Sequence, residues 1–179
     1  LRYPEFPGLN LSYEVIAGQS HRAGRDGTLP PSWSQNTARD AASGGGSHRQ
    51  ETATSPLIEV QIVDISDSIA SNAHDADDAL EIGFLSLDDL LAVPLLREAH
   101  SRTRRKYAAL GGEALRRAIV HESIDWQVGD VIDSTQKRIE TLELRSVEDV
   151  QRATTVVAAS DSLAASQTEL QCFLHRQVY

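Results

Sequence analysis

Apolar residues recur at every third or fourth position from Leu57 almost to the end of the chain, the spacing that gathers them on one face of an α-helix. No run alternates between apolar and polar residues for long enough to form a sheet. We therefore predict an all-α fold. The expected helical segments cover about 57–80, LDDLLAV after a cap at Ser86, about 94–109, about 113–144, a shorter stretch after a loop near 147–150, and a last helix capped by Ser160 or Asp161.

The first third of the chain has a different pattern. Residues 1–22 open with RYPEFPGLN, whose prolines and glycine exclude a helix, and continue with a short helical pattern, LSYEVIAG. Residues 23–55 are rich in Gly, Ser, Thr and Asn and hold too few apolar side chains to offset the entropy lost on ordering. We expect an N-terminal segment over 1–22, a flexible loop or disordered insertion over 23–55, and a helical part over 56–179.

Charge and composition narrow the classes of function. The formal net charge of −9 discourages non-specific binding to nucleic acid, and no apolar run has the length of a membrane span. The cluster Arg102, Arg104, Arg105 and Lys106 is the strongest basic group, which we interpret as a solvated helix end. The single cysteine, Cys172, indicates a reducing, cytoplasmic location, and we expect it to be buried as a small apolar residue. Because the sequence lacks methionine, we expect its numbering to begin inside a longer reading frame.

The stretch from Glu59 to Leu80 has the sharpest division into a polar and an apolar face. At 100° per residue, six polar side chains fall within an arc of roughly 100°, and these are Asp64, Asp67, Ser71, His74, Asp75 and Asp78. Apolar residues gather on the opposite side, namely Ile58, Ile62, Ile65, Ile69, Ala73, Ala76 and Leu80. The solvated face of an ordinary surface helix would give the same pattern.

The aspartates favour a second interpretation, a site for a divalent cation. Asp64, Asp67, Asp75 and Asp78 have no Lys or Arg on the same face, so they repel one another at three- and four-residue spacing. Aspartate is also a poor helix former. A bound cation would remove the repulsion, because hard cations accept carboxylate oxygens as ligands.

The same stretch carries the pattern of a known family. EVQIVDISDSIASNAHDADD resembles, without a gap, the helix E-A-Q-(I/V)-V-D-x-A-D-x-I-A-Y-x-x-H-D-x-D-D of the dGTPase-like deoxynucleoside triphosphate triphosphohydrolases, which belong to the HD-domain superfamily. The opening RYPEFPGLNLSYEVIAG is similar to the family segment that precedes this helix, and EALRRAIVHESIDWQVGDVI is similar to the helix that follows it. The resemblance covers most of the chain outside 23–55. It implies part of an HD-domain-like helical bundle, with this chain as an internal fragment.

The resemblance implies a role for each polar position. Asp67 matches the aspartate that completes the family's metal site, and Asp64 is the alternative if the register differs. Ser71 stands where the family has a tyrosine that packs against the nucleotide sugar, and Asp75 matches the aspartate that binds the sugar 3′-hydroxyl. His74 is assigned a supporting role. The implied cofactor is a divalent ion such as Mg²⁺ or Mn²⁺.

The implied reaction cleaves a dNTP to the deoxynucleoside and triphosphate. The family's other metal ligands, a histidine and a His-Asp pair, precede the YPxFxGLNL segment, with which this sequence begins. We therefore expect the chain alone to be inactive and a full-length parent to be a homo-oligomeric enzyme acting on dNTP. The alternative is a non-catalytic helical module for oligomerisation or regulation, with a decayed nucleotide site.

Overall fold

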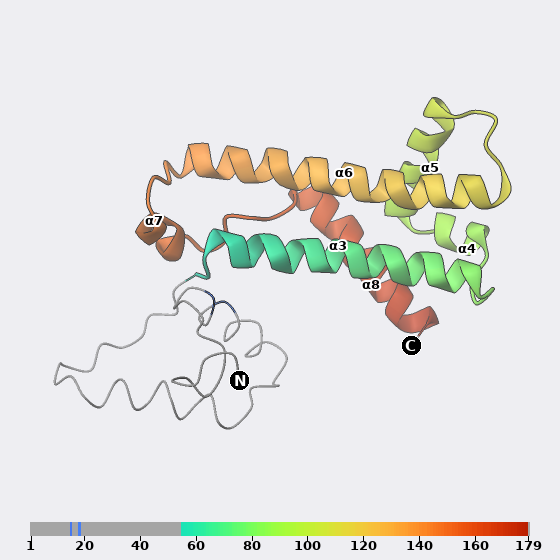
Figure 1. The fold of residues 1–179 in the computed structure, drawn as a ribbon, viewed down its shortest axis with the longest axis horizontal. Helices are drawn as coiled ribbons and strands as arrows, with labels where there is room; N and C mark the ends of the chain where they lie inside the picture. The colour runs from blue at the N-terminus through green and yellow to red at the C-terminus, as the bar shows by residue number, and fades with distance from the viewer. Residues whose placement is uncertain (1–14, 16–17, 19–54, 179) are drawn as a thin grey trace, which may run out of the picture. The chain divides into compact units, whose positions relative to one another are not determined.

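The computed structural model describes residues 15, 18 and 55–178. All the regular elements of residues 55–178 are α-helices, and no strand occurs in this part of the chain. The prediction of an all-α fold is thus confirmed for the described residues. The helices are α3 (Ile58–Glu81), α4 (Leu87–Leu91), α5 (Pro94–Lys106), α6 (Gly112–Thr141), α7 (Val147–Arg152) and α8 (Asp161–Gln177) (Figure 1).

Two predicted parts fall wholly or almost wholly outside the described residues. These are the segment 1–22, of which only Val15 and Gly18 are described, and the proposed insertion 23–55, of which only Ser55 is described. Both expectations therefore remain predictions. Among the residues that are described, no helix is long and apolar enough to cross a membrane.

The helix ends follow the predicted caps, with two differences in length. α5 stops at Lys106 rather than near 109, because the Arg104 guanidinium donates to the carbonyl of Leu110 at 2.6 Å and holds the chain in a turn. α6 stops at Thr141 rather than near 144. There Glu143 adopts a left-handed φ of +50°, and the Leu144 N–H donates back to the Ile139 carbonyl at 3.1 Å, a six-residue closure of the helix end.

The predicted loop near 147–150 is wrong, because these residues form α7. Ser146 accepts a hydrogen bond from the Asp149 N–H while the Asp149 carboxylate accepts one from the Ser146 N–H, which is a complete capping box. The non-helical stretch comes after this helix, over 153–160. Its backbone joins α7 to α8 and is important for the candidate site.

The chain divides into two compact units. The smaller comprises Leu1–Val60 and Ser146–Thr154. Within it, the Ser55 N–H donates to the Gln151 carbonyl at 2.9 Å, and a Cβ atom at Gly18 would lie only 2.9 Å from Val60 Cγ2. Only a glycine therefore fits at position 18 without a shift of its neighbour.

The larger unit comprises Gln61–Arg145 and Thr155–Tyr179 and contains the helical core. α3 and α6 run alongside each other and α8 crosses them (Figure 1). Branched aliphatic residues fill the interior, with Leu95, Leu115 and Ile119 buried on α5 and α6, and Leu163 and Leu170 buried on α8. Burial of side chains of this size stabilises the fold by about 1.5–3 kcal/mol each.

The basic cluster at the end of α5 is engaged within the unit. Arg102 pairs with Glu98 at 2.9 Å and its guanidinium lies 4.5 Å from the centre of the Trp126 ring. Lys106 reaches the Glu122 carboxylate of α6 at 2.5 Å. The exposed ends of this cluster fit the interpretation of a solvated helix terminus, with cations next to the helix carbonyls.

Candidate functional site

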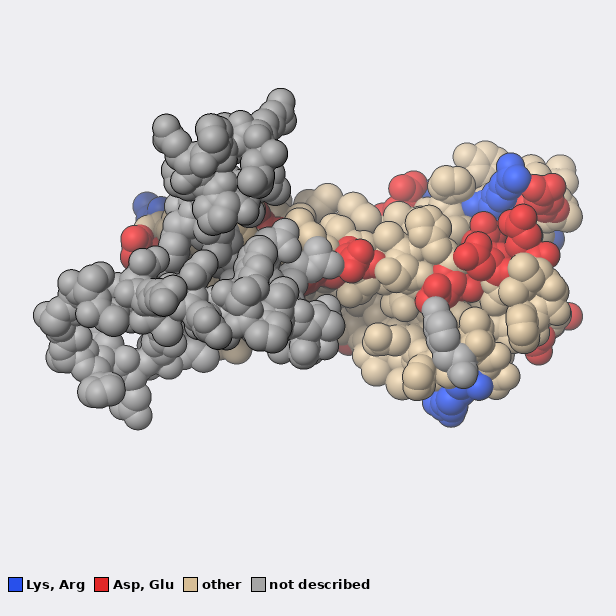
Figure 2. All heavy atoms as spheres, turned by 60° about the horizontal axis from the view of Figure 1, so that its bottom comes forward, with Lys and Arg blue, Asp and Glu red and all other residues tan. Residues whose placement is uncertain are grey.

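The polar face predicted for 57–80 lies along α3 as a single row. Asp67, Ser71 and His74 are exposed, whereas Asp64 and Asp75 are half-buried. Figure 2 shows acidic side chains gathered mainly toward the right-hand end of the view. Asp75 comes eight positions after Asp67, so their Cα atoms are about 12 Å apart along the helix axis. A ligand that contacts both must extend along α3.

The two halves of α3 are held in different ways. In the C-terminal half, Ile69, Ala73, Ala76 and Ala79 are all buried, and the small alanines let the helix approach its neighbours closely. From Ile58 to Ser68, Gln61 is the one buried residue. Ile62, which belongs to the predicted apolar side, is 47% exposed. The N-terminal half of the helix, which carries Asp64 and Asp67, therefore has little apolar anchorage.

Gln61 provides a polar anchor instead. Its side-chain oxygen accepts hydrogen bonds from two consecutive backbone N–H groups, those of Val156 at 2.9 Å and Val157 at 3.0 Å. Both valines are buried, so these N–H groups have no access to water as an alternative partner. The stretch after α7 is thereby tied to α3.

α6 holds the same stretch from its other end. The Arg138 guanidinium donates to the carbonyls of Ala158 at 2.7 Å and Ala159 at 3.0 Å. The two Asp130 oxygens accept from the Ser160 N–H at 2.7 Å and the Ser160 hydroxyl at 2.8 Å. Ser160 in turn is the N-cap of α8. Residues 156–160 thus form a polar clamp, which links α3, α6 and α8.

The C-terminal end of α3 has its own charge partner on α6. Arg116 lies 3.1 Å from an oxygen of Asp77 and 3.2 Å from an oxygen of Glu81. The Arg116–Asp77 contact is an ion pair without hydrogen-bond alignment, while the contact with Glu81 is a hydrogen bond. Acidic residues at a helix C-terminus oppose the helix dipole, and Arg116 offsets part of that cost.

An apolar groove of about 490 Å³ lies between α3 and α6, on the side of α3 opposite the acidic row. Ile62, Val128 and Ile132 line it and are 47%, 42% and 58% exposed. A hydroxyl oxygen of Thr135, also in the lining, is buried without a hydrogen-bond partner in the described structure.

The acidic row supplies oxygen ligands but not a complete metal site. In the part of the chain that the structure describes, no three His, Cys, Asp or Glu residues come close enough together to hold a metal ion. Protein metal sites need at least three such ligands in most cases. The exposed Asp67 carboxylate fits one oxygen ligand of a hard cation, with Asp64 one turn earlier as the alternative.

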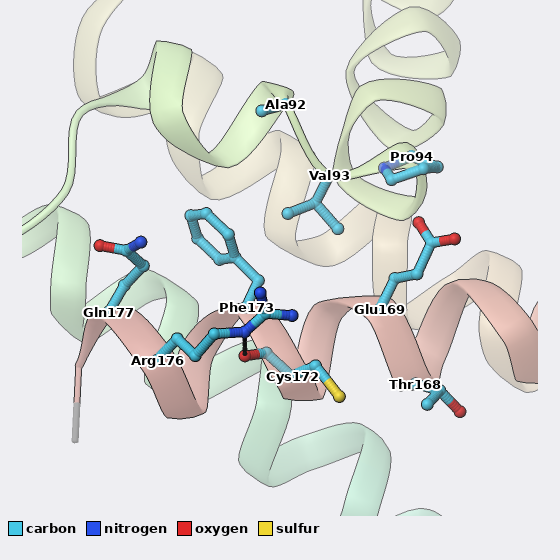
Figure 3. Close-up of a pocket in the computed structure, with 9 residues that line it drawn as sticks. All are labelled: Ala92, Val93, Pro94, Thr168, Glu169, Cys172, Phe173, Arg176 and Gln177. Atoms are coloured by element: carbon cyan, nitrogen blue, oxygen red, sulfur yellow. Dashed lines mark hydrogen bonds between the residues drawn. The ribbon is translucent and has the colours of Figure 1, made fainter.

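A second pocket, of about 390 Å³, lies between α8 and the turn from α4 to α5. Figure 3 shows Phe173 pointing toward this turn and the Arg176 Nε donating to the Cys172 carbonyl at 3.2 Å. Cys172 is exposed, so the prediction that it is buried is wrong. The reason is its place on α8, between the inward-facing Leu170 and Leu174.

Sequence reasoning placed all five candidate residues on one helix face, and the structure has them on consecutive turns of α3. These residues are Asp64, Asp67, Ser71, His74 and Asp75. The sequence alone assigns no function to Gln61, although this residue matches the glutamine of the family pattern. Helical periodicity could have indicated that Gln61 is buried, because it lies eight positions before Ile69 and within the arc of α3 that faces the interior.

Comparison with known proteins identifies relatives over the whole chain. No family model matches the sequence. A "deoxyguanosinetriphosphate triphosphohydrolase-like protein" of Rhodopseudomonas palustris (strain HaA2) is 34% identical over 187 residues, which cover 99% of this chain and 46% of the relative. Proteins of the same name from Brucella anthropi and Geobacter metallireducens are 34% and 32% identical, again over 99% of this chain and over 45% and 43% of their own length. The chain spans less than half the length of these relatives.

Proposed function

Because this chain belongs to the family of deoxyguanosinetriphosphate triphosphohydrolase-like proteins, we propose that it forms the nucleotide-facing part of a dNTP triphosphohydrolase. The observation that carries the proposal is the row Asp67, Ser71 and Asp75 on one face of α3, in which each member comes four positions after the one before. This spacing suits a ligand lying along the helix. The proposed enzyme has an HD-type helical bundle and assembles as a homo-oligomer.

The proposed reaction is hydrolysis at the α-phosphorus of the nucleotide. Water adds to this phosphorus, the bond to the sugar 5′-oxygen breaks, and that oxygen takes a proton, so that triphosphate and a deoxynucleoside are released. A divalent ion, when bound, would lower the pKa of the attacking water. The described residues supply at most part of its ligand set, with Asp67 as one ligand and Asp64 as the alternative.

The chain's own residues bind and orient the nucleotide in this proposal. The Asp75 carboxylate accepts a hydrogen bond from the sugar 3′-hydroxyl. Ser71 faces the sugar but offers no flat surface for it to pack on. His74 lies beside them as a supporting group. Replacing Ser71 by tyrosine is therefore expected to tighten nucleotide binding and lower KM.

A chimera tests the proposal without assuming anything about residues beyond this chain. This sequence replaces the matched stretch of the R. palustris relative, and release of triphosphate from each dNTP is measured with Mg²⁺ or Mn²⁺. The unaltered relative, assayed alongside, defines full activity. We expect the chimera to release triphosphate, and a folded chimera without activity would contradict the proposal.

Three variants of the chimera separate the roles. Asp67→Ala should lower kcat by more than the roughly 100-fold seen when a group that only supports a metal ligand is removed. Asp75→Ala should raise KM by about tenfold, since a hydrogen bond to a charged group contributes roughly 1.5–3 kcal/mol. Asp125→Ala, which removes an exposed carboxylate of α6, is the matched control and should change neither constant.

One observation favours a second candidate function, a non-catalytic helical module. The row on α3 is mostly exposed, and the described residues hold no three-ligand cluster. Under this alternative the chimera would fold and self-associate but would bind no dNTP. We also expect the chain by itself, with dNTP and Mn²⁺, to release no triphosphate, and turnover above that of Asp67→Ala would contradict this expectation.

A further inference from the structure

The one buried side chain at the end of α3 that carries Asp64 and Asp67 is a hydrogen-bonded glutamine rather than an apolar residue. Between Ile58 and Ser68 only Gln61 is buried, with 7% of its surface exposed. Ile62 and Val63, in the next turn, are each 47% exposed. Since few apolar side chains of this end are buried, a buried polar contact contributes strongly to fixing the rotation of the helix and its position along its axis.

Gln61 fixes both the rotation of α3 about its axis and its position along that axis. Its side-chain oxygen accepts from the N–H groups of Val156 and Val157, two donors at different points along the clamp. The clamp cannot follow α3, because Arg138 and Asp130 of α6 hold its remaining residues. A movement of α3 that broke these bonds would leave two buried N–H groups without partners, which is unfavourable.

We infer that Gln61 is a positioning residue, which through its bonds to Val156 and Val157 sets the place of the Asp64–Asp67 end of the row. This inference rests on the proposed function. Asp67 lies about 9 Å along the axis from Gln61, whereas Asp75 lies over the alanine-packed half of the helix. Loss of the Gln61 anchor therefore displaces the Asp67 end and leaves the Asp75 end in place.

The first test uses this chain itself and amide hydrogen exchange, which does not depend on the proposed function. In the unaltered chain, the amides of residues 61–65 and those of Val156 and Val157 should exchange through the same opening step as denaturant is raised. In Gln61→Met, which keeps the size of the side chain but removes the acceptor, exchange at both places should accelerate while that of residues 73–79 does not. Independent opening of the two places in the unaltered chain would overturn the inference, even if the variant failed to fold.

The second test measures Mn²⁺ binding to the chimera described above. Binding is followed by the loss of the electron paramagnetic resonance signal of free Mn²⁺, and turnover is measured in parallel. Gln61→Met should raise the Mn²⁺ concentration at half-saturation by about tenfold, the lower range for loss of a group that supports a metal ligand. KM for dNTP should change little, because Asp75 keeps its place.

Gln127→Met is the matched control. Gln127 is 2% exposed, its Nε2 donates to the Ser123 carbonyl of α6, and its Oε1 accepts from Gln167 of α8, so both hydrogen-bond partners lie outside α3. Loss of a buried hydrogen bond that only stabilises the fold lowers the amount of folded protein but not the Mn²⁺ affinity of the folded part. Gln127→Met should therefore keep the Mn²⁺ concentration at half-saturation of the parent chimera. Equal shifts in both Met variants would overturn the positioning role while leaving the proposed function intact. Absence of Mn²⁺ binding and turnover in the parent chimera would instead overturn the proposed function, and with it the role of Gln61 toward Asp67.

Discussion

Replacing Asp130 by alanine tests how much of the stability of the larger unit depends on the polar clamp. The carboxylate accepts from the Ser160 N–H at 2.7 Å and from the Ser160 hydroxyl at 2.8 Å, and both residues are half-buried. A hydrogen bond to a charged group contributes roughly 1.5–3 kcal/mol, and partial exposure favours the lower end of that range. The hydroxyl can turn to Ser162, which lies 3.2 Å away, so its loss costs less than the loss of the N–H bond.

We therefore expect Asp130→Ala to lower the free energy of unfolding by about 2–3 kcal/mol. For a chain of this size the melting temperature would fall by roughly 4–12 °C. The measurement is urea unfolding followed by circular dichroism at 222 nm. Asp133→Ala, which removes an exposed carboxylate three residues further along α6, is the control and should leave the unfolding midpoint unchanged.

A double-mutant cycle with Ser160→Ala assigns the effect to this contact. The coupling free energy between Asp130 and Ser160 should be about 1 kcal/mol, because the single substitution at Ser160 removes only the hydroxyl bond and keeps the N–H bond. A loss below about 0.5 kcal/mol in Asp130→Ala, the usual range for surface substitutions, would refute the reasoning that the clamp stabilises the fold.

Three further predictions concern single positions. Hydrogen bonds from the Ser86 side chain and backbone lower the pKa of Asp89. The stability that this carboxylate contributes is therefore present at neutral pH and is lost as the pH falls through the lowered pKa. We expect the urea midpoint of Asp89→Ala to lie below that of the unaltered chain at pH 7 and to equal it in strong acid. Gly83 has a φ of +76° and open space where a Cβ atom would lie, so backbone strain alone should make Gly83→Ala destabilise the chain by about 1–2 kcal/mol. Gly129→Ala, in an open position within α6, should instead stabilise it by about 0.5–1 kcal/mol, and equal midpoints in urea for the two variants would contradict this. Cys172 is exposed, so one thiol per chain should react with 5,5′-dithiobis(2-nitrobenzoic acid) without denaturant, and reaction only after unfolding would show that the thiol is covered.

The sequence predicted the parts of the fold that depend on local signals. The beginning of α4 follows from Ser86 and the end of α3 from Gly83, since a hydroxyl cap and a left-handed glycine act within one turn of the chain. The end of α6 could not be predicted in the same way, because its left-handed residue is Glu143 rather than glycine. The apolar pattern predicts a loop at the position of α7 because it is too short to indicate a helix, although Ser146 and Asp149 form a capping box there.

The candidate site was predictable only as far as one helix extends. The common face of Asp67 and Asp75 follows from helical periodicity alone, and it needs no tertiary information. The partner of Gln61 could not be predicted, because Val156 and Val157 lie about ninety-five positions further along the chain and donate through their backbone. The exposure of Ile62 likewise depends on which neighbouring elements pack against α3.

The charge composition of α3 has a consequence for the solution in which the protein is kept. The helix carries seven acidic residues and neither Lys nor Arg, and several of its carboxylates are one or two turns apart. At an ionic strength of about 0.1 M the Debye length is about 10 Å, comparable with these separations, and at about 0.01 M it is about 30 Å. In dilute buffer the carboxylates therefore repel one another along the whole helix, and added sodium chloride relieves this repulsion without any specific binding. Low-salt storage would thus loosen the N-terminal turns of α3 first, where apolar contacts are fewest.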